Sequence, residues 1–331
     1  MAVHKSALRS LMGRCVLMAV IGLVSNTLTA LPAQAVESAS DPTSFAYVLQ
    51  ADSRWKTKPD AVRELAACDR DWIVIDAAYT SEENGRWSKA DLDAILAGKS
   101  GRRVLAYLSI GEAEDYRSYW KKSWDVDGDG KPDPGAPEFL MAENPDWDGN
   151  YRVRYWHKEW QSIILAEIDR IAEQGFDGAY LDIVDAFETF EFDGNDWIDD
   201  RRNDETGKTF RADMVSWVTK IGERLRKTEA SRLLIPQNGS QLLADPNYRT
   251  IISGIGMEDV FTNGNRTQRP SESKSRLKDV ESLVKDNKPV LLIEYPKKAE
   301  LQKMVIEKSQ EHHFVWLIAD RPLKTLGESG K

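Results

Sequence analysis

The sequence predicts a closed (β/α)8 barrel, the TIM-barrel class, built as a single domain. Short apolar runs rich in β-branched and aromatic residues alternate with amphipathic segments of helical length. This alternation is typical of a parallel sheet that is covered by helices on both faces. Eight such runs can be counted, which is the number of strands in this barrel.

The predicted strands are residues 45–49, 72–77, 104–110, 179–184, 233–236, 252–257, 290–293 and 314–318. The clearest helix covers residues 156–174, where isoleucines fall on one face and Gly175 provides a C-terminal cap. Pro59, Lys89 and Pro296 open three other helices. The competing fold is an open, doubly wound sheet. Because no glycine-rich phosphate loop follows any predicted strand, the sequence favours the barrel.

The first 35 residues form a predicted secretory signal peptide, and residues 36–331 form the barrel. A basic start precedes an apolar run over residues 15–24 and a final Ala33-Gln34-Ala35, as in a signal peptide cleaved after Ala35. An uncleaved anchor is the alternative, but the run is shorter than the ~20 residues that a membrane span needs. We therefore expect a secreted or periplasmic protein that does not contact the membrane after cleavage.

The charge balance disfavours nucleic acid as a partner. The chain carries 45 basic and 54 acidic residues, a net charge of −9, and cleavage removes basic residues without removing acidic ones. Such a surface repels phosphate groups, and it suits a neutral or cationic substrate better. Cys68 is the one cysteine left after cleavage, so no internal disulfide is possible. We expect the mature protein to be a monomer.

Polar residues gather where the predicted strands end, and in this barrel class the active site lies at those ends. Like charges concentrated at one mouth cost stability, so we interpret them as functional. The polar set is Asp76, Tyr79, Glu112, Asp182, Asp185, Gln237, Asn238, Glu258, Asp259, Glu294 and Tyr295.

The residue types at the strand ends narrow the chemistry. None of the three histidines outside the signal peptide ends a predicted strand, which disfavours a His-ligated zinc site and a Ser-His-Asp triad. Carboxylate chemistry remains, and glycoside hydrolysis requires two carboxyl groups with different pKa values. The residues alone leave four unranked candidates: Asp182, Glu258, Glu112 and Glu294.

Aromatic residues are abundant in the predicted loops. Stacking on sugar rings and ordinary hydrophobic packing both explain such residues. The set is Trp55, Trp87, Tyr116, Trp120, Trp124, Trp147, Tyr151, Tyr155 and Trp156.

Four segments resemble glycoside hydrolase family 114, the endo-α-1,4-polygalactosaminidases and their relatives. They are Ile75-Asp76-Ala77-Ala78-Tyr79, residues 106–112 (AYLSIGE), residues 175–182 (GFDGAYLD) and Gly256-Met257-Glu258. The resemblance extends over about residues 45–318. It implies a retaining glycosidase that cleaves an α-linked amino-sugar polysaccharide, such as α-1,4-polygalactosamine, and that needs no cofactor for catalysis.

By motif, the resemblance assigns Asp182 as the nucleophile and Glu258 as the acid/base. A retaining pair places its carboxyl groups ~5–5.5 Å apart. Two alternatives stay open: Asp182 as a structural carboxylate, and Asp259 as the active group in place of Glu258. The residues expected to bind substrate or to orient the pair are Asp76, Tyr79, Glu112, Asp185, Asn238, Glu294 and Tyr295.

Residues 125–133 resemble the start of an EF-hand calcium loop. Aspartates stand at positions 1, 3, 5 and 9 and Gly130 at position 6, but Ala136 replaces the usual Glu at position 12. Alternating Asp and Gly are also good turn formers. We predict a structural Ca²⁺ that takes no part in catalysis. Its candidate ligands are Asp125, Asp127, Asp129 and Asp133.

A long insert, residues 190–209, follows the fourth predicted strand and departs from the family pattern. Rich in Asp, Arg and Gly, it is placed to cap the barrel mouth. Two further functions stay open. A non-catalytic carbohydrate-binding barrel would carry the same aromatic residues. A metal-dependent barrel phosphodiesterase would need a metal cluster that the strand ends do not clearly offer.

Overall fold

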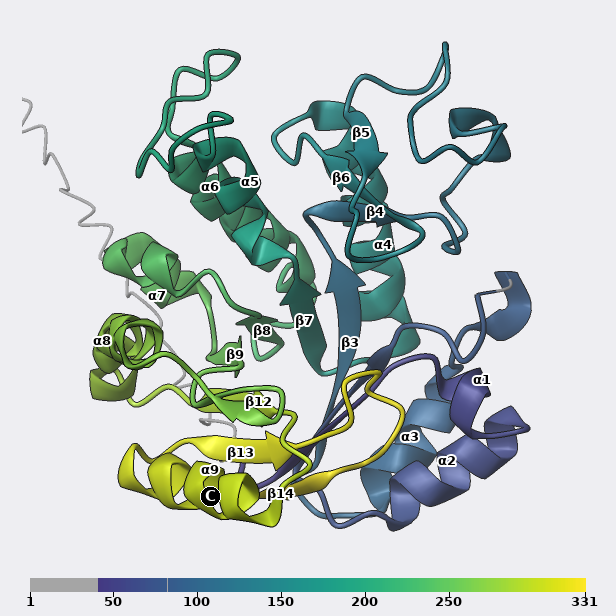
Figure 1. Ribbon diagram of the computed structural model, residues 1–331. Coiled ribbons are helices and arrows are strands. Elements are labelled where there is room, and N and C mark those ends of the chain that lie inside the picture. The colour runs from purple at the N-terminus through teal and green to yellow at the C-terminus, as the bar shows by residue number, and fades with distance from the viewer. Residues whose placement is uncertain (1–40, 82) are drawn as a thin grey trace, which may run out of the picture. The chain divides into compact units, whose positions relative to one another are not determined.

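Eight parallel strands alternate with helices, in the predicted order (Figure 1). The computed structural model describes residues 41–331 apart from residue 82, so the predicted signal peptide lies outside the described residues. The parallel strands are β1 (Phe45–Val48), β2 (Trp72–Asp76), β3 (Arg103–Ser109), β7 (Gly178–Asp182), β8 (Leu233–Pro236), β9 (Ile255–Glu258), β12 (Val290–Glu294) and β13 (Val315–Ile318).

The helices follow the strands in chain order. They are α1 (Ala51–Arg54), α2 (Lys58–Ala67), α3 (Lys89–Ala97), α4 (Lys158–Gln174), α5 (Phe187–Glu191), α6 (Phe210–Leu225), α7 (Pro246–Ile251), α8 (Pro270–Lys285) and α9 (Ala299–Glu311). The 3-10 turns are η1 (Glu83–Gly85), η2 (Lys122–Trp124), η3 (Val184–Ala186) and η4 (Ser240–Ala244). As predicted, Gly175 ends the long helix α4 in a left-handed conformation.

Strand pairing runs around most of the barrel. One parallel sheet has the order β1-β2-β3-β7-β8, and another joins β9, β12 and β13 in parallel. An isolated parallel bridge between Gln237 and Gly256 connects the two sheets. In the described part of the chain no ladder joins β13 directly to β1. Instead β14 (Glu328–Gly330) pairs antiparallel with β13, and Phe45 N donates to Ser329 Oγ across 2.9 Å.

Two strand boundaries differ from the prediction by more than one residue, each for a local reason. The fourth strand ends at Asp182 rather than at residue 184, because Ile183 has φ 56° and turns the chain into η3. The sixth strand begins at Ile255 rather than at residue 252, because α7 extends to Ile251 and Ile252 is its C-cap, with its N–H bonded to Tyr248 O.

The hydrophobic core divides into an inner and an outer layer. Alternate strand residues fill the barrel interior, including Tyr47, Tyr107, Tyr180 and Ile293. The residues between them, such as Leu181, pack against the helices. Successive strand side chains point to opposite faces, so the parity of a residue at the end of a strand decides whether it faces the barrel mouth.

Two insertions stand at the carboxyl ends of the strands. One is a three-stranded antiparallel sheet of β4 (Glu112–Glu114), β6 (Asn150–Val153) and β5 (Leu140–Glu143). The other is the insert between α5 and α6. In Figure 1 they rise on either side of the ends of β3 and β7. A short ribbon of β10 (Thr262–Asn263) and β11 (Arg266–Thr267) follows β9.

Candidate active site

A cavity of about 750 Å³ opens at the carboxyl ends of the strands. Both insertions and the loop after β13 form its walls. Seven carboxylates and three basic side chains are among the residues that line it, and these are Glu112, Asp146, Asp148, Asp182, Asp185, Glu188 and Glu258, with Arg152, Arg321 and Lys324. We call this space the active-site cavity.

Asp182 is the last residue of β7 and shares the inward parity of Tyr180. Tyr107 Oη donates to Asp182 Oδ2 across 2.9 Å, and Gln237 Nε2 donates to Oδ1 across 3.1 Å. The backbone N–H of Ile183 also donates to Oδ1, at 2.8 Å. Burial raises the pKa of Asp182 to about 6, and the Ile183 and Tyr107 bonds oppose that rise. The carboxylate is thus fixed in direction by three donors.

Glu258 ends β9 and lines the same cavity. The Tyr295 hydroxyl donates to Glu258 Oε1. Burial, and after it the negative charge of Asp182, raise the pKa of Glu258 to about 7, while the Tyr295 bond opposes the rise. Because Asp182 acts on the titration of Glu258, the two carboxyl groups are electrostatically coupled. Their separation stays a prediction.

A second group of contacts holds Tyr295. The Arg321 guanidinium lies over its ring, 4.0 Å from the centroid. Arg321 also forms an ion pair with Asp259 at 2.8 Å. Asp259, the sequence alternative to Glu258, therefore has a partner of its own and is not among the residues lining the cavity. Through Arg321 and Tyr295, Asp259 helps to hold Glu258 in place.

Left-handed backbone accompanies the two central carboxylates. Ile183 directly follows Asp182 with φ 56°, and Asp259 directly follows Glu258 with φ 51°. A positive φ is a genuine outlier for a β-branched residue, and such conformations concentrate at functional sites. Gly111 makes room for the Ile183 turn, since a Cβ there would lie 2.1 Å from Ile183 O. Asn238, with φ 59°, accepts a hydrogen bond at Oδ1 from Glu258 N across 3.1 Å.

Two more carboxyl groups have raised pKa values inside the cavity. Glu112 accepts a hydrogen bond from Asn144 Nδ2 at 2.8 Å, and burial raises its pKa to about 7. Burial and then the charge of Glu188 raise the pKa of Asp185 to about 8. These residues and Asn238 and Tyr295 line the cavity, where the sequence predicted substrate contacts.

Three predicted substrate-binding residues do not line the cavity in this structure, and their contact with substrate stays a prediction. Glu294 is 0% exposed and accepts hydrogen bonds from the N–H groups of Phe261 and Thr262. Its two sequence neighbours show the reason, since Ile293 and Tyr295 point into the barrel and Glu294 points away.

The other two residues contact neighbouring elements. Asp76 accepts a hydrogen bond from Gln50 N at 2.6 Å and pairs with Arg117 at 2.8 Å. Tyr79 donates its hydroxyl to Trp55 O at 2.6 Å. Both side chains therefore serve the packing around β2.

Two inward strand residues that line the cavity, Tyr47 and Tyr107, were not among the predicted polar residues, and Gln237 was among them without an assigned role. Tyr47 is 0% exposed and Gln237 is 3% exposed. Within the described chain, Tyr47 Oη and Gln237 Oε1 have no hydrogen-bond partner. Buried polar atoms are rarely left unpaired because this costs stability, so these two atoms mark an unsatisfied polar region beside the cavity. The alternation of inward strand residues is the sequence signal that would have identified them.

The structure also sorts the aromatic residues. Most of the predicted set are buried or half-buried in the core, and Tyr116 and Trp147 alone of that set line the cavity. Trp197, in the insert, lines it as well and was not predicted.

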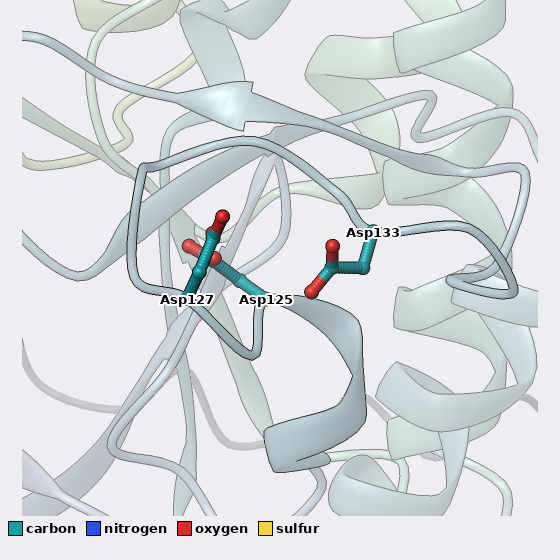
Figure 2. A group of neighbouring side chains, drawn as sticks. All are labelled: Asp125, Asp127 and Asp133. Atoms are coloured by element: carbon teal, nitrogen blue, oxygen red, sulfur yellow. The ribbon is translucent and has the colours of Figure 1, made fainter.

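The acidic loop, residues 125–133, brings three of its four predicted ligands together (Figure 2). Carboxylate oxygens of Asp125, Asp127 and Asp133 all lie within 4.8 Å of one another. Asp129 points elsewhere and pairs with Lys131 at 2.7 Å. Asp125 also accepts hydrogen bonds from Tyr151 Oη and from two loop N–H groups. None of these aspartates lines the active-site cavity.

The family model of glycoside-hydrolase family GH114 matches residues 25–330. This chain belongs to family GH114. An uncharacterized protein of Deinococcus radiodurans is 35% identical over 255 residues, which cover 77% of this chain and 74% of that protein. One from Methanocaldococcus jannaschii is 36% identical over 238 residues, covering 71% of this chain and 63% of that protein. Membership of family GH114 makes this protein a glycosidase.

Solved structures confirm the barrel class predicted from sequence. The glycoside hydrolase domain of PelA from Pseudomonas aeruginosa matches with a TM-score of 0.62 at 16% identity, covering 87% of this chain and 98% of that domain. Ega3 from Aspergillus fumigatus, in complex with galactosamine, matches with a TM-score of 0.59 at 17% identity, covering 86% of this chain and 94% of Ega3. Across residues 41–331, leaving aside residue 82, no helix is long and apolar enough to cross a membrane.

Proposed function

We propose that this GH114 chain is a secreted, retaining glycosidase that cleaves α-linkages in an amino-sugar polysaccharide such as α-1,4-polygalactosamine. One observation carries the proposal: Asp182 and Glu258 end two barrel strands and line one cavity, each held by its own donors. The galactosamine bound to Ega3 supports the substrate class.

The reaction takes two steps. In the first, a carboxylate oxygen of Asp182 attacks the anomeric carbon while protonated Glu258 gives its proton to the departing glycosidic oxygen. In the second, ionised Glu258 takes a proton from water, the water oxygen attacks the anomeric carbon, and Asp182 leaves as a carboxylate. Glu258 gives up one proton in the first step and takes one from water in the second, so it is protonated again when the reaction ends.

The electrostatics of the two groups suit these roles. Asp182 must be ionised and Glu258 protonated in the same molecule. The pKa of Glu258, about 7, lies above that of Asp182, about 6. Asp182 loses its proton first as the pH rises, and its negative charge then helps to keep the proton on Glu258. Tyr107 and Gln237 stabilise the ionised nucleophile.

The cavity suits an amino sugar. Its carboxylates outnumber its basic side chains, and a protonated amino group is attracted to such a surface. Glu112, Asp185, Asn238 and Tyr295 are the side chains that we expect to contact the sugar units next to the cleaved bond.

Secretion rests on residues 1–35. N-terminal mass analysis of protein exported from its host should find Ala35 removed and Val36 first. An intact Met1 in the exported protein would show an anchor instead. The expected monomer is checked by light scattering.

The test of function is hydrolysis of partly de-N-acetylated α-1,4-galactosaminan, followed by NMR of the newly formed anomer. The proposal expects the α-anomer first. An initial β-anomer would show inversion and would remove Asp182 as nucleophile. Binding without hydrolysis by the wild-type chain would support the carbohydrate-binding barrel, and metal-dependent phosphodiester hydrolysis would support the phosphodiesterase.

A further inference from the structure

The two tryptophans with the most exposed side chains both line the active-site cavity. Trp147 is 53% exposed and Trp197 is 65% exposed, and every other tryptophan in the described residues is buried or half-buried. They come from different insertions, Trp147 from the turn between β5 and β6 and Trp197 from the insert. Exposed aromatic side chains gathered at one cavity indicate a binding surface.

The turn that carries Trp147 is fixed to the floor of the cavity. Trp147 N donates to Asn144 O at 3.1 Å, and Asn144 Nδ2 donates to the buried carboxylate of Glu112. Asp146 and Asp148 flank Trp147 and are exposed. Neither carboxylate has a hydrogen-bond or ion-pair partner within the described chain, so both are available to a cation.

The insert that carries Trp197 is anchored at its base. Glu191, 2% exposed, accepts hydrogen bonds from Asp200 N and from Arg211. Phe190 stacks on Phe210 with ring centroids 5.1 Å apart. An antiparallel bridge between Phe192 and Trp197 then presents the indole at the cavity. The exposure of Trp197 is therefore not that of a loose loop.

We propose that Trp147 and Trp197 are two sugar-binding platforms that hold units of the glycan on either side of the cleaved bond. This rests on the proposed function. An indole offers an apolar face to the C–H face of a sugar ring and attracts a nearby ammonium group. Asp146 and Asp148 add negative charge beside Trp147. The ligand that fits is a chain of amino sugars with free, protonated amino groups, long enough to reach both platforms.

The experiment measures kcat/KM on α-1,4-linked galactosamine oligosaccharides of increasing length. In the wild-type protein kcat/KM should rise with length until both platforms are covered. Trp147→Ala and Trp197→Ala should each reduce that rise about fivefold, through KM, with Trp→Phe losing less. Val126→Ala and Val284→Ala remove exposed side chains that do not line the cavity and should keep the wild-type rise.

A second set of measurements tests whether the charges of the sugar amino groups and of Asp146 and Asp148 contribute to binding. The same oligosaccharides after chemical N-acetylation should show a smaller dependence on Trp147, and Asp146→Asn with Asp148→Asn should lower the preference for the free amine. Values of kcat/KM that do not depend on length, or tryptophan variants that match Val126→Ala, would overturn the platforms while leaving the glycosidase intact. If no oligosaccharide of any length is cleaved, the proposed function itself fails.

Discussion

The acidic loop and the active-site cavity are built from the same residue types and have opposite electrostatics. In the loop, the Tyr151 hydroxyl and backbone N–H groups lower the pKa of Asp125. In the cavity, burial raises the pKa of Asp182 to about 6, of Glu258 to about 7 and of Asp185 to about 8. The loop thus holds charged oxygens in reach of water, and the cavity holds carboxyl groups that exchange protons near neutral pH.

This difference separates a candidate ion-binding loop from a catalytic site. A cation requires carboxylates that are ionised and close together. Acid/base catalysis requires carboxyl groups whose pKa values lie near the working pH. The surroundings of each carboxyl group, more than the number of carboxyl groups, decide which task it suits.

The largest expected effect comes from Asp182→Asn. The amide keeps the shape of the side chain but cannot attack carbon, so kcat should fall on the order of 10⁴-fold while substrate binding persists. Asp133→Asn is the matched control from the acidic loop and should keep its kcat. Steady-state kinetics and calorimetric titration with galactosamine oligosaccharides measure both. Near-normal turnover by Asp182→Asn would leave Asp185 or Glu112 as the nucleophile.

The next effect is the dependence of kcat/KM on pH. Activity requires ionised Asp182 and protonated Glu258, so it should rise as the pH passes about 6 and fall as it passes about 7. Each limb should change about tenfold per pH unit. A profile that is flat from acid to mildly basic pH would show that these two carboxyl groups do not limit the reaction.

Tyr295→Phe tests the support of Glu258. The Tyr295 hydrogen bond lowers the pKa of Glu258, so removing it should raise that pKa by about one unit. The basic limb of the pH profile, where kcat/KM falls as Glu258 loses its proton, should then move to higher pH. Arg321→Gln should move the limb in the same direction by less, because Arg321 is partly exposed and screened by water. Arg63→Gln, on the surface of α2, is the control. A basic limb unchanged by Tyr295→Phe would contradict the role of this contact.

The sequence predicts the strands and four candidate carboxylates because apolar runs and their polar ends are local signals. The choice of Asp182 and Glu258 among the four comes from the resemblance to family 114, and their catalytic role stays a prediction. The prediction for Glu294 takes strand ends without regard to parity, and Ile293 and Tyr295 show that the inward face carries the residues on either side of it. Sequence reasoning missed Arg321 and Trp197 because both lie in loops whose approach to the cavity depends on packing between distant segments. The left-handed turn at Ile183 was equally invisible, since nothing in an isoleucine predicts a positive φ.

The smallest expected effect belongs to the acidic loop. If the loop holds Ca²⁺ as its sequence predicts, EDTA should lower the Tm by about 5 °C, and calcium should restore it. Activity at moderate temperature should persist, because the loop aspartates do not line the cavity. Asp133→Asn should lose the response, and Asp182→Asn should keep it. The same Tm for the wild type in EDTA and in calcium would leave the loop as an ordinary turn.

The assignment of Asp182 as nucleophile is tested most directly by trapping the covalent intermediate. Glu258→Gln cannot protonate a leaving group or activate water, so a galactosaminyl fluoride, whose leaving group needs no proton, should glycosylate the protein faster than water releases it. Intact-protein mass analysis should find one added sugar, and peptide mapping should place it on Asp182. An adduct on Asp185 or Glu112, or no adduct together with an inverted product, would contradict the retaining pair of Asp182 and Glu258.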